Sequence, residues 1–129
     1  MPTWGEIKEY ARSKYNLSHD EEERISLVWE FDDGRTQQIG VSHFTAYEMD
    51  WIEFRSYVCK EADLNPRVAL RKNADFPIGG LALDEDGDYF MVYSARLDSL
   101  DPDEFELPLR VIARVADSIE KEHTAKDDF

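Results

Sequence analysis

Residues 49–59 read Met-Asp-Trp-Ile-Glu-Phe-Arg-Ser-Tyr-Val-Cys and carry large apolar side chains at both even and odd positions. Ile52 and Phe54 belong to the even set, and Trp51 and Tyr57 to the odd set. Alternate residues of a β-strand point to opposite faces of a sheet, so both faces of this strand are expected to be covered. We therefore predict that residues 49–59 form the central strand of the fold.

The composition indicates one folded, acidic domain. The chain has 129 residues, a length typical of a single domain, expected here over residues 1–129, and 42% of the residues are hydrophobic. Acidic side chains number 29 against 15 basic ones, which leaves a formal net charge of -14. A field of this sign repels phosphate backbones, so we expect no nucleic acid among the partners.

The N-terminal segment and the single cysteine indicate where in the cell the protein is expected. Residues 1–6 lack the basic region and apolar run of a signal peptide, and no stretch approaches the roughly 18 apolar residues of a membrane span. We therefore expect a cytoplasmic protein with no membrane partner. Cys59 has no second cysteine with which to form an internal disulfide, and its strand context predicts a small buried side chain.

Two helices have clear start signals. Thr3 followed by Glu6 is a capping-box pair, and apolar residues continue at helical spacing, so the first helix is predicted over residues 3–15. Asn65 followed by Pro66 is typical of an N-cap and a proline at the first helical position, which predicts a second, short helix.

The last segment predicts a long amphipathic helix. Asp101 and Glu104 resemble a capping pair around Pro102, and a stripe of apolar residues continues to about residue 122. Pro108 lies inside this pattern, where it removes a backbone donor and crowds the preceding turn. We expect a kink near residue 104 or a break after the first turn. Residues 124–129 are polar and are expected to fray.

Alternating apolar residues from position 24 predict a first hairpin. The sheet face on which these residues lie determines the length of its turn. A two-residue loop would pair Leu27 with Gly40 and divide the apolar side chains between the two faces. A three-residue loop over residues 32–34 pairs Leu27 with Ile39 and unites the apolar set, so this register is favoured. Gly34 then supplies the left-handed residue of a bulged turn.

The segments that flank this hairpin carry weaker signals. The acidic run Asp20–Glu23 indicates a solvated loop. The returning strand is predicted to end at about Phe44, and residues 45–48 to connect it to the central strand. A second hairpin, with strands over 81–83 and 89–96, is predicted later in the chain, and its longer strand is expected to pair with the central one.

The turn of the second hairpin resembles part of a calcium-binding loop. Asp84, Asp86 and Asp88 alternate like the first ligands of an EF-hand loop. That loop needs glycine at its sixth position, where this chain has Tyr89. A hairpin turn fixed by Gly87 explains these acids better than a metal site does.

Taken in order, these elements predict an α+β fold: a helix, three antiparallel strands, a short helix, two antiparallel strands and a long C-terminal helix, with one twisted antiparallel sheet covered by helices. No phosphate loop, nucleophile elbow or paired-cysteine motif appears. His19, His43 and His123 lie far apart in sequence without ligand spacing. We expect no catalytic residues, no cofactor and no metal.

Apolar surface is the remaining candidate for function. In the favoured register, Val28 and Phe44 lie on the sheet face opposite the main apolar set, and Trp51 and Tyr57 can join them as a patch that binds a partner protein. The same aromatic residues can instead lie under a helix or in the seam of a homodimer, because aromatic side chains are most often core or interface packing.

The order of elements resembles the type III secretion chaperone-like fold, in particular the YbjN-type family. The resemblance is carried by the segments Asp50–Ser56, Asn65–Ala74, Gly80–Tyr89, Leu100–Leu107 and Ala113–Glu120. It implies a non-enzymatic module that binds a partner polypeptide through apolar sheet and helix surface, as a homodimer, with no catalytic residues to carry over. The alternatives are a dimeric regulatory domain of the sensory-transduction type and a small-ligand or metal-binding protein.

Overall fold

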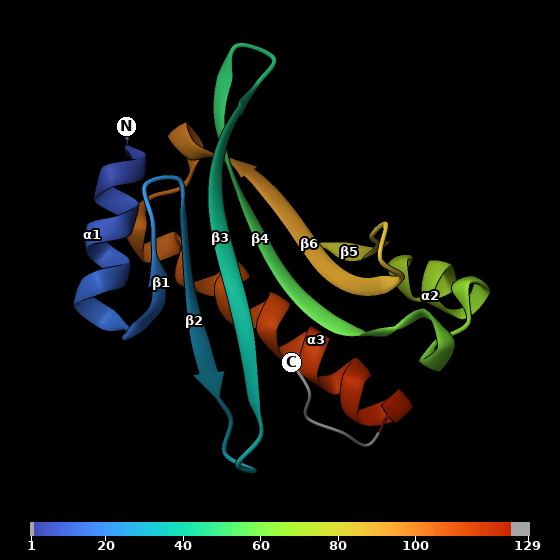
Figure 1. The fold of residues 1–129 in the computed structure, drawn as a ribbon. Coiled ribbons are helices and arrows are strands. Elements are labelled where there is room, and N and C mark those ends of the chain that lie inside the picture. Colours follow the sequence, from blue (N-terminus) through green and yellow to red (C-terminus); the bar gives the residue numbers. More distant parts are fainter. Residues whose placement is uncertain (1, 125–129) are drawn as a thin grey trace.

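The computed structural model describes residues 2–124, which form a six-stranded antiparallel sheet and three α-helices (Figure 1). The strand order is β1-β2-β3-β4-β6-β5. The strands are β1 (Leu17–Asp20), β2 (Arg24–Glu30), β3 (Thr36–Ala46), β4 (Met49–Lys60), β5 (Gly80–Leu83) and β6 (Asp88–Arg96). The helices are α1 (Trp4–Lys14), α2 (Pro66–Asn73) and α3 (Glu106–Thr124), with 3₁₀ turns η1 (Glu61–Asp63), η2 (Leu97–Ser99) and η3 (Pro102–Glu104). The predicted α+β class and helix order are confirmed.

Helices α1 and α3 pack against one face of the sheet, and α3 passes behind the strands in Figure 1. The core between the two layers is continuous. It takes Ile7 and Ala11 from α1, Ile112 and Ala116 from α3, and Phe54 from β4, and each of these side chains is fully buried. Burial of this apolar area is the main favourable term in the stability of the fold.

Strand β4 lies inside the sheet, as predicted, with β3 on one side and β6 on the other. Its residues Ile52 and Phe54 are buried under the helices. Trp51 and Tyr57, on the opposite face, are only partly buried. The expectation of cover on both faces is therefore correct for one face alone, because an antiparallel sheet needs to bury only one of its faces.

A β-bulge near the end of β4 sets the position of Cys59. The pairing shifts between Tyr57, opposite Phe90, and Cys59, opposite Tyr89. The extra residue turns Cys59 to the helix face, where its side chain is buried as predicted. Burial raises the pKa of the thiol to about 11. At neutral pH the group stays protonated, so it lacks the thiolate character of a nucleophile.

The first hairpin has the predicted three-residue register. Leu27 lies opposite Ile39, and Ile25 lies opposite Val41. All four side chains are buried against the helices. Gly34 has a φ of 86°, the left-handed conformation that this turn requires. The second hairpin, β5 and β6, is also confirmed, including the pairing of β6 with β4.

Strand β1 is not revealed by the sequence pattern, and the prediction of a solvated loop beginning at Asp20 is wrong for that residue. Asp20 ends β1 and pairs with Ile25 of β2. Three of the four residues of β1 are exposed, so the strand carries no apolar alternation. Pairing with β2, rather than a pattern of its own, makes this segment a strand.

The connection between β3 and β4 is tighter than predicted. Strand β3 extends to Ala46, which pairs with Met49, so only Tyr47 and Glu48 form the turn. Both residues have positive φ, 55° and 63°, a geometry that usually selects Asn-Gly. The absence of those residues hides the turn from a reading of the sequence. The turn projects beyond the neighbouring strands in Figure 1.

The predicted helix starts are confirmed for α1 and α2. The hydroxyl of Thr3 accepts a hydrogen bond from the amide of Glu6 at 3.2 Å. The side chain of Asn65 accepts one from the amide of Arg67 at 2.8 Å. Each contact satisfies an amide that has no partner inside its helix.

The final helix breaks at its start, which is one of the two predicted alternatives. Residues 102–104 form η3, α3 begins at Glu106, and Pro108 therefore lies in the first turn, where no amide donor is needed. The predicted side-chain cap at Asp101 is wrong, because its carboxylate makes no capping hydrogen bond. The predicted fraying of residues 124–129 concerns a segment of which 125–129 lie outside the described residues.

A buried ionic cluster joins the first hairpin to α3. Arg35 follows the turn between β2 and β3, and its Nε lies 2.9 Å from Oδ1 of Asp117. Its Nη2 lies 3.2 Å from Oε1 of Glu120. Asp117 and Glu120 are 6% and 1% exposed, so the guanidinium offsets the charge of two desolvated carboxylates.

Candidate functional site on the open face of the sheet

The sheet face opposite α1 and α3 carries the candidate site. The strand register aligns its side chains in rows, so residues distant in sequence become neighbours. We call this set the open face: Arg24, Val28, Gln38, Gly40, Ser42, Phe44, Trp51, Glu53, Arg55, Tyr57 and Phe90.

All four residues predicted to bind a partner lie on the open face, but they form two pairs rather than one patch. Phe44 lies opposite Trp51, and the rings stack with their centroids 6.4 Å apart. Val28, half exposed, and Tyr57 lie towards the other end of the face, on β2 and β4. Polar rows of β3 and β4, which include Ser42 opposite Glu53, separate the two pairs.

A hollow of about 510 Å³ lies over these polar rows. Its floor and walls come from β2, β3 and β4 alone. The lining residues are Arg24, Val28, Thr36, Gln38, Gly40, Ser42, Glu53, Arg55 and Tyr57. The hollow is therefore bordered by Val28 and Tyr57 at one end, and its remaining lining is mainly polar.

Arg55 is held rigidly at the edge of the hollow. Its Nε donates to Oε1 of Glu53 at 2.9 Å, and its guanidinium carbon lies 4.0 Å from the ring centroid of Phe90. Partial burial lowers the pKa of Arg55, whereas the hydrogen bond with Tyr57 and the charge of Glu53 raise it, and the net pKa lies above its ordinary value. A guanidinium stacked on an aromatic ring keeps its other N–H groups available to a ligand.

Asp84 in the acidic turn between β5 and β6 holds the hairpin turn through its carboxylate. One oxygen of Asp84 accepts hydrogen bonds from the amides of Asp86 and Asp88, at 3.0 Å and 2.9 Å. The other accepts the hydroxyl of Tyr57 at 3.1 Å. The amide of Asp88 is the main cause of the lowered pKa of Asp84. Both oxygens are engaged in the turn geometry that the sequence predicts.

His43 forms a polar contact on the opposite side of the sheet. Its Nδ1 lies 2.5 Å from Oε2 of Glu23, and its Nε2 lies 2.9 Å from Oδ1 of Asp50. Partial burial lowers the pKa of His43, the two carboxylates raise it, and the net pKa lies above its ordinary value. The ring also stacks on Trp4, so this histidine ties α1 to the sheet.

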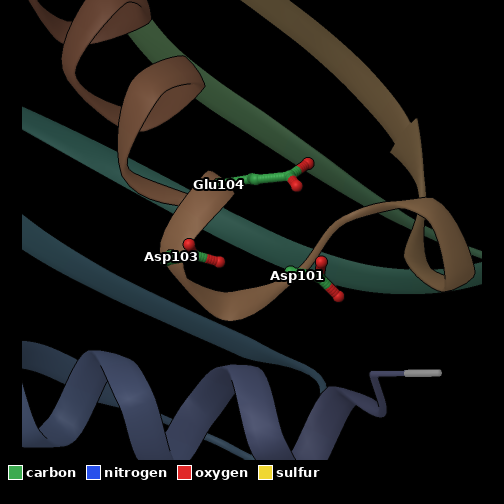
Figure 2. Close-up of side chains that lie close together, drawn as sticks. All are labelled: Asp101, Asp103 and Glu104. Atoms are coloured by element: carbon green, nitrogen blue, oxygen red, sulfur yellow. The ribbon is translucent and has the colours of Figure 1, made fainter.

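Within residues 2–124, one group of acids approaches metal-ligand spacing. Asp101, Asp103 and Glu104 each offer an oxygen, and these oxygens lie within 4.8 Å of one another (Figure 2). All three side chains are exposed, and neither a histidine nor a cysteine belongs to the group. Hydrated carboxylates of one short turn are common on an acidic chain, and we assign no site to them.

Sequence reasoning does not identify Arg24, Gly40 and Arg55 as site residues, although the first hairpin gives part of the information. The pairing of Leu27 with Ile39 places Arg24 opposite Ser42, whereas Gly40 aligns with Arg55 only through the register of β3 with β4, whose tight turn the sequence does not reveal. A glycine at this mid-strand position, flanked by arginines of the neighbouring strands, is the signal that the pairing makes visible.

Comparisons with solved structures give the fold a context. The chain is similar to a chain of the "Structure of the HopA1-SchA Chaperone-Effector Complex", with a TM-score of 0.66 and 16% identity over 89% of this chain and 90% of that chain. It is also similar to a chain of the "Crystal Structure of the ExsC-ExsE Complex", with a TM-score of 0.60 and 19% identity over 95% and 97% of the two chains.

A third similar structure contains a type III secretion chaperone. The chain is similar to a chain of the "Crystal structure of the Yersinia Pestis type III secretion chaperone SycH in complex with a stable fragment of YscM2", with a TM-score of 0.60 and 13% identity over 88% of this chain and 95% of that chain. No family model and no curated protein matches the chain. In residues 2–124 no helix has the length and apolar character needed to cross a membrane. The fold is therefore that of type III secretion chaperones, as the sequence resemblance implies, while the YbjN-type resemblance stays a prediction.

Proposed function

We propose that this chain is a non-enzymatic, chaperone-like module that binds a segment of another polypeptide on its open face. The observation that carries the proposal is a sheet face on which residues 2–124 place no helix. This face presents exposed Phe44 stacked on partly buried Trp51, and a half-exposed Val28. Apolar side chains presented beside satisfied polar groups are typical of protein-binding surfaces.

The similar solved structures support this proposal. Two of them are complexes of a chaperone with an effector or with a protein fragment, and each similarity covers most of both chains. The chemistry of two candidate reactive groups also supports a non-enzymatic role. The buried Cys59 has a raised pKa, and Asp84 of the β5–β6 turn accepts hydrogen bonds from backbone amides.

Capture of the partner provides the test. The wild-type protein is immobilised on a resin and incubated with lysate of its source cell. We expect it to retain a defined set of proteins. Val28→Asp and Trp51→Asp should reduce their recovery by about 30-fold, the effect of losing an interface hot spot worth about 2 kcal/mol. Quantitative mass spectrometry of the retained proteins gives the ratio.

The matched control for capture is Leu107→Asp, which introduces the same charge at an exposed leucine of α3, away from the open face. It should retain the wild-type set. Equal recovery by the wild type and both open-face variants, with unchanged thermal unfolding, would contradict the proposed surface.

We further propose that the chain forms a homodimer through α2 and β5, an arrangement that would also serve a regulatory domain. Leu70 and Val68 of α2 are 71% and 41% exposed, and Leu83 of the adjacent β5 is 42% exposed. Exposed large apolar side chains on two neighbouring elements are typical of an interface.

Sedimentation velocity tests the dimer. We expect a dimer that dissociates on dilution for the wild type and a monomer for Leu70→Asp, because a buried unpaired carboxylate is costly at an apolar interface. Leu107→Asp again serves as the control and should remain dimeric. A monomeric wild type at high protein concentration would exclude this proposal without affecting partner binding to the open face.

A further inference from the structure

Arg24 stands out among the charged groups of the open face. It is exposed, and no carboxylate of residues 2–124 lies within ion-pair distance of its guanidinium. The other charged side chains of the open face, Glu53 and Arg55, are engaged with each other. The side chain of Arg24 lines the hollow described above.

The guanidinium of Arg24 lies beside the backbone of Gly40. A Cβ at this position would lie 3.6 Å from both Nε and Nη2 of Arg24 and 3.9 Å from the carbonyl oxygen of Arg55. Glycine weakens a strand interior, and in such a position it often marks the close approach of a ligand or of another backbone. The bare backbone of β3 thus forms the floor between two arginines.

The two arginines give this hollow a sign opposite to that of the whole chain. Its charged lining consists of Arg24, Arg55 and Glu53, and Glu53 is already engaged by Nε of Arg55. Two guanidinium groups that line one hollow repel each other unless an anion lies between them. Planar guanidinium forks match the geometry of a carboxylate, which they bind through paired hydrogen bonds.

We propose that the hollow binds the carboxylate of an aspartate or glutamate side chain of the partner polypeptide, held between Arg24 and Arg55 over Gly40. This inference rests on the proposed function and names the chemistry of the segment that the open face accepts. Apolar surface borders the hollow: Val28 and Tyr57 line it, and the Phe44–Trp51 stack lies across the polar rows. The segment therefore carries an acidic residue flanked by apolar ones.

A peptide titration followed by NMR tests the proposal without knowledge of the natural partner. The probe is the acetylated and amidated peptide Leu-Ala-Glu-Ala-Leu, and its counterpart carries glutamine in place of glutamate. With ¹⁵N-labelled protein we expect saturable shifts of the Gly40 amide and of the Nε–H signals of Arg24 and Arg55. Affinity on the order of millimolar is expected for a single anchored side chain, at least about tenfold weaker for the glutamine peptide.

Variants separate the arginine from general charge effects. Arg24→Gln should abolish the preference for the glutamate peptide, whereas Arg110→Gln, the same charge change on an exposed position of α3, should preserve it. Arg24 makes no ion pair within the described residues, so its replacement is expected to leave folding intact, which amide spectra of the free variant verify.

The remaining outcomes overturn the assignment. Equal shifts with both peptides, or no saturable shift with either, would mean that the hollow does not recognise a carboxylate. Inorganic phosphate that competes as strongly as the glutamate peptide would make it a general anion site instead. Because the titration needs no natural partner, its failure is distinct from failure of the capture experiment: retained proteins that depend on Trp51 would leave the open face as a binding surface and remove only this anchor.

Discussion

Arg35→Ala is expected to lower the free energy of unfolding by about 3–5 kcal/mol, the range measured when one partner of a buried ion pair is removed. The guanidinium contacts Asp117 at 2.9 Å and Glu120 at 3.2 Å, and its own side chain is 15% exposed. Without it, two carboxylates remain under the first hairpin with reduced compensation of their charge. Urea unfolding followed by circular dichroism measures the change.

One further variant tests whether loss of charge compensation, rather than loss of the ions themselves, causes this effect. Replacing Arg35, Asp117 and Glu120 together by Met, Leu and Met removes the charges and keeps similar volume. Such a variant is expected to be close to the wild type in stability, because apolar packing can substitute for a desolvated ion cluster. A single Arg35→Ala variant within about 1 kcal/mol of the wild type would show that water or other groups solvate the carboxylates.

Gly79→Ala is expected to be the second severely destabilising change, by about 2–5 kcal/mol, from backbone strain and overpacking combined. Gly79 has a φ of 79°. A Cβ there would lie 2.6 Å from Cδ1 of Ile112 in α3 and 2.9 Å from the carbonyl oxygen of Val92 in β6. A side-chain methyl can rotate away, but the carbonyl belongs to the sheet, so the segment before β5 must move.

Gly34→Ala is the matched control, because it separates strain from overlap. Gly34 has a similar φ of 86°, and nothing lies within 4 Å of a Cβ built on it. Gly34→Ala should lower the free energy of unfolding by about 1–2 kcal/mol, the strain of placing alanine in the left-handed conformation. The difference between the two variants in thermal or urea unfolding then measures the overlap at Gly79, and equal costs would contradict that overlap.

The sequence predicts most of this fold because its apolar side chains agree with its turn chemistry. The three-residue turn that ends at Gly34 and the pairing of Leu27 with Ile39 follow from one requirement, a single apolar face. The turn at Tyr47 and Glu48 lacks that agreement. Its residues adopt positive φ against their own preference, and the long pairing of β3 with β4 and a hydrogen bond from Nε1 of Trp51 to the carbonyl of Ala46 stabilise the conformation.

The candidate site is predicted only in part, for a related reason. Val28, Phe44, Trp51 and Tyr57 are recognisable as apolar residues outside the core pattern, and their common face follows from strand alternation. Their separation into two pairs, and the arginines between them, depend on how β2, β3 and β4 align side by side. Arg24 and Arg55 stand 31 positions apart in sequence (55 - 24), and no local pattern relates them.

The bulge that turns Cys59 inward gives this protein an internal reporter. A thiol-specific dye in solution cannot reach a sulfur that is enclosed by the core and carries its proton at neutral pH. Each labelling event therefore records a molecule that had opened around β4, and the rate of labelling reflects the population of such openings. The labelled fraction, measured by the shift of the dye conjugate on native gels, follows these local openings in dilute solution, without denaturant and without introducing any mutation.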